Sequence, residues 1–416
     1  MFEGLRKKPV PIETLLKSES ETRAAETVRI LEAKVHDLIS SESKMSAFHR
    51  ERFLRITDAY NKRWFVRLGL ANETTPELHA YEEALKENKE FDARERVEYE
   101  RWQESLRPVL QELDAVTNDK EGTGKGKRPL LLIMGGGMKG AYSAGQVLAL
   151  EKVGYNTAFT DVVGISAGSC AASYLVAGQG RTFASLLAEK CSSKELFDPL
   201  RVTKMIDTGV VAEGMRHGEY ALDMEALRAS PTGLHMVVTN QETGLTECLD
   251  AKESPVGVID VCDASSTLPF FRPAKHIDGK KYIDGALGEL SLETIIEKYN
   301  PTSILVLPNR SFSEFESSRE YTVLEKVVIE GAQFGSAGKH GSLEDVVRMK
   351  EYTRNMIAET GKSAGVHVGV LWNPETGLSS TTINKDELKR GMLESYNAAL
   401  ADIGTLLQAE PERQAA

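Results

Sequence analysis

The spacing of apolar positions changes along the chain and divides it into two parts. Within residues 1–127 apolar side chains recur three or four positions apart, as at Val28, Leu31, Val35 and Leu38. This spacing puts them on one face of a helix, so we expect about three to five helices in this part. From residue 128 onward, short apolar runs alternate with glycine-rich loops and helical segments, which predicts an α/β domain.

The glycine and charge content suggests where the two parts meet. Residues 1–127 hold 25 acidic and 23 basic side chains, while the whole chain carries a formal charge of −11, so most of the negative excess lies downstream. Residues 118–127 are polar and glycine-rich, as linkers are. We therefore expect a helical N-terminal region over 1–127 and an α/β domain over 128–416. The first either binds a partner or regulates the domain, or it packs on the domain as an extension; periodicity does not separate these readings.

The α/β domain opens with two strand–loop–helix units in tandem. The apolar run 130–134 predicts a buried parallel strand, and 161–163 predicts a second one. Each is followed by a glycine-rich loop and a helix of small residues. Further along the chain, the pattern predicts two strand pairs, 234–240 with 245–249 and 275–277 with 281–283, and two more strands over 303–307 and 366–372. It also predicts helices over 182–191, 292–298, 321–334, 344–359 and 386–407. A further helix is expected to start at 258 and to end before Pro269. The long connection 196–232 is either a lid or a set of short helices.

The second loop carries a nucleophile-type motif. Gly164, Ser166 and Gly168 form Gly-x-Ser-x-Gly at the junction of strand and helix, which is the pattern of a nucleophile elbow. The flanking glycines suit a strained turn against which neighbouring backbone presses, and the helix N-terminus favours negative charge near the serine. The chemistry that this pattern indicates is acyl transfer.

The first loop supplies what such a serine lacks. Gly135, Gly136 and Gly137 offer unencumbered backbone amides for a developing oxyanion. With Gly140 the same loop also matches a dinucleotide fingerprint, but that reading expects an acidic residue about 20 positions on, after the second strand. The serine elbow stands there instead. A phosphate-binding P-loop is disfavoured because Ala141, and not lysine, follows Gly140.

Composition narrows the class of protein. No apolar run approaches the roughly 18 residues of a membrane span, and the acidic balance argues against nucleic acid as a partner. Four cysteines without metal-type spacing favour a reducing, cytoplasmic setting, and Cys170 is expected in the core. His235 and His367 sit inside predicted strands, where burial is the expected role. No loop of clustered carboxylates suggests calcium, so we expect no metal and no other cofactor.

Four ordered motifs carry a resemblance to a known family. The glycine loop 135–140, the elbow 164–168, the Ala-Ser-x-x-x-Pro-x-Phe segment 264–271 and Asp284-Gly285-Ala286 appear in the order and spacing of the patatin-like phospholipases. The resemblance covers residues 128–307. It implies a patatin-like three-layer α/β fold with a central, mostly parallel sheet.

The resemblance also implies roles for individual residues. Ser166 would be the nucleophile and Asp284 its base, in a Ser–Asp dyad that needs no histidine. The amides of Gly136 and Gly137 would form the oxyanion hole, with Gly135 in the same loop. The supporting positions would be Lys139, where the family has Arg or Lys, together with Gly164, Gly168 and Gly285. Met134 departs from the family, many of whose members carry Asp there, and this change concerns the anchoring of the loop.

The implied reaction is hydrolysis of an acyl ester in a phospholipid through an acyl-serine intermediate. Contact with a membrane surface would be transient and peripheral, with apolar segments 205–215 and 323–334 as candidates, although core packing also explains both. Two alternatives stay open: hydrolysis of soluble esters or thioesters, and a non-catalytic protein that uses the domain as a scaffold and interacts through residues 1–127.

Overall fold

The computed structural model describes residues 99, 101–118, 122, 124–197, 206–268, 271–288, 290–312 and 365–408. The chain divides into two compact units, Met1–Arg94 and Glu95–Ala416. All described residues belong to the second unit. Among them, no helix is long and apolar enough to cross a membrane.

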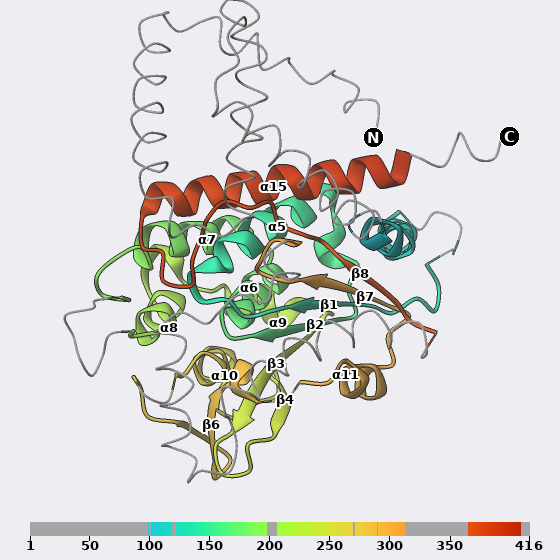
Figure 1. The fold of residues 1–416 in the computed structure, drawn as a ribbon. Coiled ribbons are helices and arrows are strands. Elements are labelled where there is room, and N and C mark those ends of the chain that lie inside the picture. Colours follow the sequence, from blue (N-terminus) through green and yellow to red (C-terminus); the bar gives the residue numbers. More distant parts are fainter. Residues whose placement is uncertain are drawn as a thin grey trace, which may run out of the picture. The chain divides into compact units, whose positions relative to one another are not determined.

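An eight-stranded mixed sheet forms the centre of this unit (Figure 1). Five strands run parallel in the order β3-β2-β1-β7-β8, while β4 and β6 pair antiparallel with β3 and β5 pairs antiparallel with β6. The strands are β1 (Pro129–Ile133), β2 (Asp161–Ile165), β3 (Gly233–Asn240), β4 (Thr246–Asp250), β5 (Lys275–Ile277), β6 (Lys280–Asp284), β7 (Ser303–Leu307) and β8 (His367–Val370). The predicted strand pairs and the mostly parallel sheet are confirmed.

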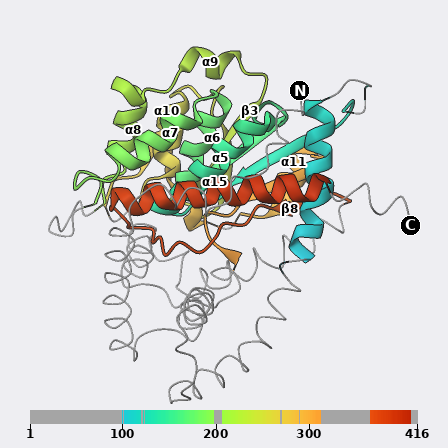
Figure 2. The ribbon, with the colours of Figure 1, turned by 90° about the horizontal axis from the view of Figure 1, so that it is seen from above.

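Helices cover both faces of the sheet, which confirms the predicted α/β class and its layers. In Figures 1 and 2, α15 lies along α5 on the outside of one face. The α-helices are α5 (Gly140–Val153), α6 (Ala167–Val176), α7 (Gly180–Ser185), α8 (Gly209–Arg216), α9 (Met224–Ala229), α10 (Val258–Ser265), α11 (Leu292–Tyr299) and α15 (Lys385–Gln408). Shorter turns are η3 (Gly137–Lys139), η4 (Tyr155–Thr157), η5 (Leu186–Lys190, a π-helix), η6 (Gly218–Tyr220) and η7 (Gly285–Leu287).

The central strands are apolar on both faces because each face is buried under helices. In β1, Leu131 and Ile133 join the core that contains α5 and α6, while Leu130 and Leu132 join the core that contains α11. Successive side chains of a strand point to opposite faces, so one uninterrupted apolar run serves both cores. This arrangement explains why the run 130–134 shows no alternation in sequence.

A helix over 101–117 packs with the α/β domain. Leu106 and Leu110 are buried in the core on the α5 side, and Trp102 is buried in the other core. At Gly369 of β8 an added Cβ would lie 2.8 Å from the Cα of Leu106, so strand and helix backbones approach closely. The compact unit that contains this helix begins at Glu95, and the division into regions 1–127 and 128–416 stays a prediction. The other predicted N-terminal helices, and the helices over 321–334 and 344–359, lie outside the described residues.

Candidate active site

The sharp turn between β2 and α6 places Ser166 at its apex. Ser166 has φ 53° and ψ −123°, a conformation that costs L residues on the order of 1–3 kcal/mol. The two motif glycines permit close backbone contacts: an added Cβ would lie 2.5 Å from the Cα of Ser169 at Gly164, and 2.1 Å from the carbonyl oxygen of Ile133 at Gly168. The predicted elbow is thus present, and its glycines are required by packing.

Two strands that meet end to end bring Ser166 and Asp284 together. β2 pairs in parallel with β3 as far as Val237, and β6 pairs antiparallel with β3 from Val238 onward. Because β4 occupies the other edge of β3, β2 and β6 must share one edge and approach each other along it. Ser166 follows the last residue of β2, and Asp284 is the last residue of β6. The Ser166 hydroxyl donates a 2.7 Å hydrogen bond to Oδ2 of Asp284.

Asp284 is buried without a cation. Its residue is 3% exposed, its Oδ1 accepts a 2.8 Å hydrogen bond from the Ala286 N–H, and no ion pair joins it to any described residue. Burial raises the pKa of Asp284 to about 6, although the hydrogen bonds from Ala286 and Ser166 act in the opposite direction. The following Gly285 is required, because an added Cβ would lie 2.1 Å from the carbonyl oxygen of Val237.

Ser265 supports the turn at Ser166 through hydrogen bonds. Its Oγ accepts a 2.9 Å hydrogen bond from the Ser166 N–H and donates a 2.7 Å hydrogen bond to the carbonyl oxygen of Val237. With its only proton used there, Ser265 must accept the 2.7 Å contact from the Ser169 hydroxyl. Two residues on, the carbonyl oxygen of Thr267 accepts a hydrogen bond from the Asp284 N–H. One short segment therefore contacts both members of the Ser166–Asp284 pair.

The glycine loop lies beside the elbow. An added Cβ at Gly135 would lie 3.2 Å from the Cβ of Ser166, so Gly135 is the loop glycine in contact with the serine. A Cβ added at Gly136 would lie next to Asn309. At Gly137, which has φ 58°, an added Cβ would meet the carbonyl oxygen of Ser380. The amides of Gly135, Gly136 and Gly137 donate no hydrogen bond to a described residue, whereas the next amide, that of Met138, donates to Ser380.

Lys139 ends η3 and precedes α5 in the same loop. It is half-buried, and its amide donates to the carbonyl oxygen of Gly136. The structure thus places every predicted site residue in or next to one group of loops at the carboxyl ends of β1 and β2. Their chemical roles stay predictions.

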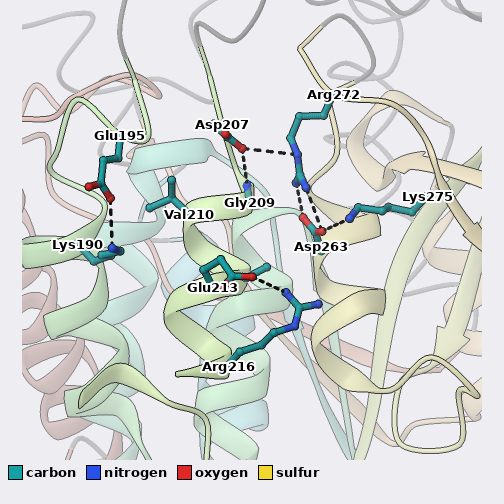
Figure 3. Close-up of a pocket in the computed structure, with 11 residues that line it drawn as sticks. Lys190, Glu195, Asp207, Gly209, Val210, Glu213, Arg216, Asp263, Arg272 and Lys275 are labelled. Atoms are coloured by element: carbon teal, nitrogen blue, oxygen red, sulfur yellow. Dashed lines mark hydrogen bonds and ion pairs between the residues drawn. The ribbon is translucent and has the colours of Figure 1, made fainter. Parts of the chain in front are cut away.

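A charged cavity of about 400 Å³ lies near this group but does not include the dyad residues (Figure 3). Arg272 and Lys275 both point at Asp263 of α10 and form ion pairs with it. Burial alone would raise the pKa of Asp263, but the hydrogen bonds and charges of Arg272 and Lys275 hold it below the ordinary value. Because Asp263 stands two residues before Ser265, these ion pairs brace the segment that supports the elbow.

Two supporting residues were missed by sequence reasoning. Ser265 lies inside a recognised motif, but nothing in the motif says which backbone group it contacts. Asn309 follows β7 and hydrogen-bonds beside the glycine loop. Its signal was a polar residue just past the carboxyl end of a buried parallel strand, where sites of α/β sheets gather.

Other sequence expectations have mixed outcomes. His235 is buried and bonds Asp161 at 2.8 Å, three residues along β3 from Val238, which pairs with Asp284. Cys170 is buried in the core, so both structural readings are confirmed. His367, the first residue of β8, is exposed, so its expected burial is wrong. In the segment 205–215 the described part forms most of α8, with Met215 buried, and segment 323–334 lies outside the described residues.

Comparison with known proteins gives one family match and several distant structural likenesses. The model of the family described as patatin-like phospholipase matches residues 131–290. No curated protein matches the chain significantly. The crystal structure of VipD from Legionella pneumophila is 14% identical, with 67% of each chain covered and a TM-score of 0.39.

A chain in the complex of SpcU with ExoU from the type III secretion system of Pseudomonas aeruginosa is 16% identical. The likeness covers 68% of this chain and 54% of that one, with a TM-score of 0.31. Both scores are too low to bear on function. The family match spans the glycine loop, Ser166 and Asp284, so residues 131–290 are similar to the patatin-like phospholipase family.

Proposed function

We propose that the chain is a lipid acyl hydrolase of the phospholipase A type, which cleaves acyl esters of glycerophospholipids through Ser166 and Asp284. The family match supports lipid ester hydrolysis in general terms. The observation that carries the finer proposal is the 2.7 Å hydrogen bond from the Ser166 hydroxyl to the Asp284 carboxylate, at a strained turn beside the glycine loop.

In the first half of the reaction the Ser166 oxygen attacks the ester carbonyl while its proton passes to Oδ2 of Asp284. The carbonyl oxygen becomes an oxyanion, for which the glycine-loop amides are the available donors. Collapse of this intermediate breaks the ester bond, and Asp284 returns the proton to the departing alcohol. Acyl-Ser166 and a lysolipid result.

In the second half a water molecule attacks acyl-Ser166 and gives a proton to Asp284. The fatty acid leaves, and the proton returns to Ser166. A base that acts near neutral pH works best with a pKa not far below the ambient pH. Burial raises the pKa of Asp284 to about 6, so the carboxylate is ionised at pH 7 yet more basic than an exposed aspartate.

The proposed substrate determines where the enzyme would act. Phospholipid acyl chains lie in a bilayer, so the enzyme would contact a membrane surface transiently, from the cytoplasm. Residues 1–127 would hold any protein partner. Hydrolysis of soluble esters or thioesters is the second candidate, because it would use every active-site residue named above.

The test compares the full chain with two variants on mixed phospholipid vesicles. Ser166→Ala removes the nucleophile, and Asp284→Asn removes the base while keeping its shape. Free fatty acid and lysolipid are measured by mass spectrometry, and a short-chain soluble ester is assayed in parallel. We expect release of both products by the wild type and a loss of at least about 10³-fold in each variant.

The outcomes separate the candidates. Cleavage of the soluble ester through Ser166 with no release from vesicles would retain the chemistry and reject the phospholipid substrate. Full activity of Asp284→Asn would reject the dyad. A wild type that is inactive on both substrates would favour the non-catalytic reading.

A further inference from the structure

Asn309 joins the two ends of the glycine loop. It follows β7, is 1% exposed and has φ 51°. Its Nδ2 donates a 2.5 Å hydrogen bond to the carbonyl oxygen of Met134, the residue before the glycines. Its Oδ1 accepts a 3.0 Å hydrogen bond from the N–H of Ser143, in the first turn of α5. A single side-chain amide therefore links the end of the strand to the start of the helix.

Asparagine in particular meets the hydrogen-bonding and backbone requirements of this position. A donor and an acceptor are needed in one short planar group, and an ionised aspartate would offer only acceptors. The backbone is in the left-handed region, which asparagine and glycine tolerate better than other residues. A Cβ added at Gly136 would lie 3.1 Å from the Cβ of Asn309, so the loop packs closely against this residue.

The loop has few other anchors on this side. The Met134 amide donates to Leu307, and the Met138 amide donates to Ser380. Between them the three glycine amides have no partner among the described residues. Glycine imposes little conformational restriction of its own, so the direction of these amides depends on how the two ends of the loop are held.

We propose that Asn309 is a positioning residue, which fixes the glycine loop so that its free amides stay directed at the oxygen of the acylated carbonyl. This inference rests on the proposed hydrolase function. Asn309 does not contact the substrate; it acts through Met134 and Ser143. Misdirected oxyanion donors weaken binding of the transition state more than binding of the ester, so the loss falls on kcat and not on KM.

Three variants test the proposal. Asn309→Gly removes the amide and keeps the left-handed backbone, and we expect kcat for a soluble ester to fall about 10–100-fold with KM within about twofold. Asn309→Asp keeps the shape and the acceptor for Ser143 but loses the donor to Met134, so it should also lower kcat. Asn300→Gly is the matched control: Asn300 has φ 46°, is exposed at the end of α11 and should leave kcat unchanged.

A second measurement does not depend on turnover. Hydrogen exchange followed by mass spectrometry should show faster exchange in peptides over 134–143 for Asn309→Gly and Asn309→Asp, with unchanged exchange over β2 and α6. Labelling of Ser166 by a fluorophosphonate, in which the serine oxygen displaces fluoride from phosphorus, should slow in parallel with kcat.

The outcomes are distinct. Normal exchange over 134–143 in both variants would overturn the anchoring role, even in an active enzyme. Faster exchange with an unchanged kcat would overturn the link to catalysis. A wild type that neither cleaves an ester nor reacts with the fluorophosphonate would reject the proposed function and with it the catalytic part of this inference, while the exchange data would still decide whether Asn309 holds the loop.

Discussion

Two buried aspartates close together in sequence have opposite electrostatic environments. Asp263 faces Arg272 and Lys275, and its pKa lies below the ordinary value. Asp284 faces a serine hydroxyl and a backbone amide, and its pKa is raised to about 6. Both side chains are nearly inaccessible to solvent. The difference shows that burial raises the pKa of a carboxyl group only where no cation lies close enough to offset it.

The largest effect is expected when the ion pairs of Asp263 are removed. Asp263→Asn leaves two cations facing a neutral amide, and we expect it to lower the free energy of unfolding by about 3 kcal/mol, at the lower end for buried pairs because both cations retain some access to solvent. Urea denaturation measures this loss. Asp260→Asn on the same helix is the control: its pair with Arg216 is more exposed, so it should cost at most about 1 kcal/mol. Equal losses would contradict the distinction.

An effect of comparable size and opposite sign is expected at the other aspartate. The pKa of Asp284 rises from 3.8 to about 6 on folding, so the folded state binds more protons than the unfolded state between these values and stability falls as pH rises through them. Asp284→Asn removes this penalty. The gain should reach as much as about 3 kcal/mol above pH 6 and vanish below about pH 4.

This gain is measured by urea denaturation at pH 4 and pH 7.5. Ser166→Ala keeps the buried carboxylate and should not reproduce it. A destabilised Asp284→Asn at pH 7.5 would mean that the hydrogen bonds of the carboxylate outweigh its burial.

The smallest expected effect is the pH dependence of activity that the raised pKa of Asp284 predicts. The base acts only when ionised, so kcat/KM should rise about tenfold per pH unit below about pH 6 and level off above it. The measurement is a profile on a soluble ester between pH 4.5 and 8. Asp260→Asn, which removes a carboxylate away from the dyad, should leave the midpoint in place. A profile that is flat across this range is the result that contradicts the assignment of Asp284.

The sequence predicted the elements that carry the dyad but not the way in which they meet. Apolar runs and Asp-Gly turns identified β2 and β6, because strand periodicity and turn chemistry are local properties. That β2 and β6 share one edge of β3 and stop beside each other depends on pairing between distant segments. Only the resemblance of ordered motifs linked Ser166 to Asp284 before the structure did.

Supporting contacts and the start of the compact unit were beyond reach for related reasons. Asn309 hydrogen-bonds to residues more than 160 positions away, and no local pattern encodes such a contact. The helix over 101–117 stands before the polar, glycine-rich stretch 118–127 that predicts a linker, so the linker signal grouped it with the N-terminal region. Its buried Leu106 and Leu110 lie in the core of the α/β domain. One face of an amphipathic helix can join a core while its average composition stays polar.

The packing of α15 on α5 sets a lower limit on the piece of this chain that can fold. At Gly145 of α5 an added Cβ would lie 2.2 Å from the carbonyl oxygen of Met392, so the two helix backbones are in close contact. A fragment trimmed to the family match at 131–290 would lack α15 and also β7, which pairs with β1. It would expose an unpaired strand edge and an apolar helix face, both of which promote aggregation. Expression of the segment 131–290 by itself should therefore yield insoluble material, although every residue of the proposed dyad would be present.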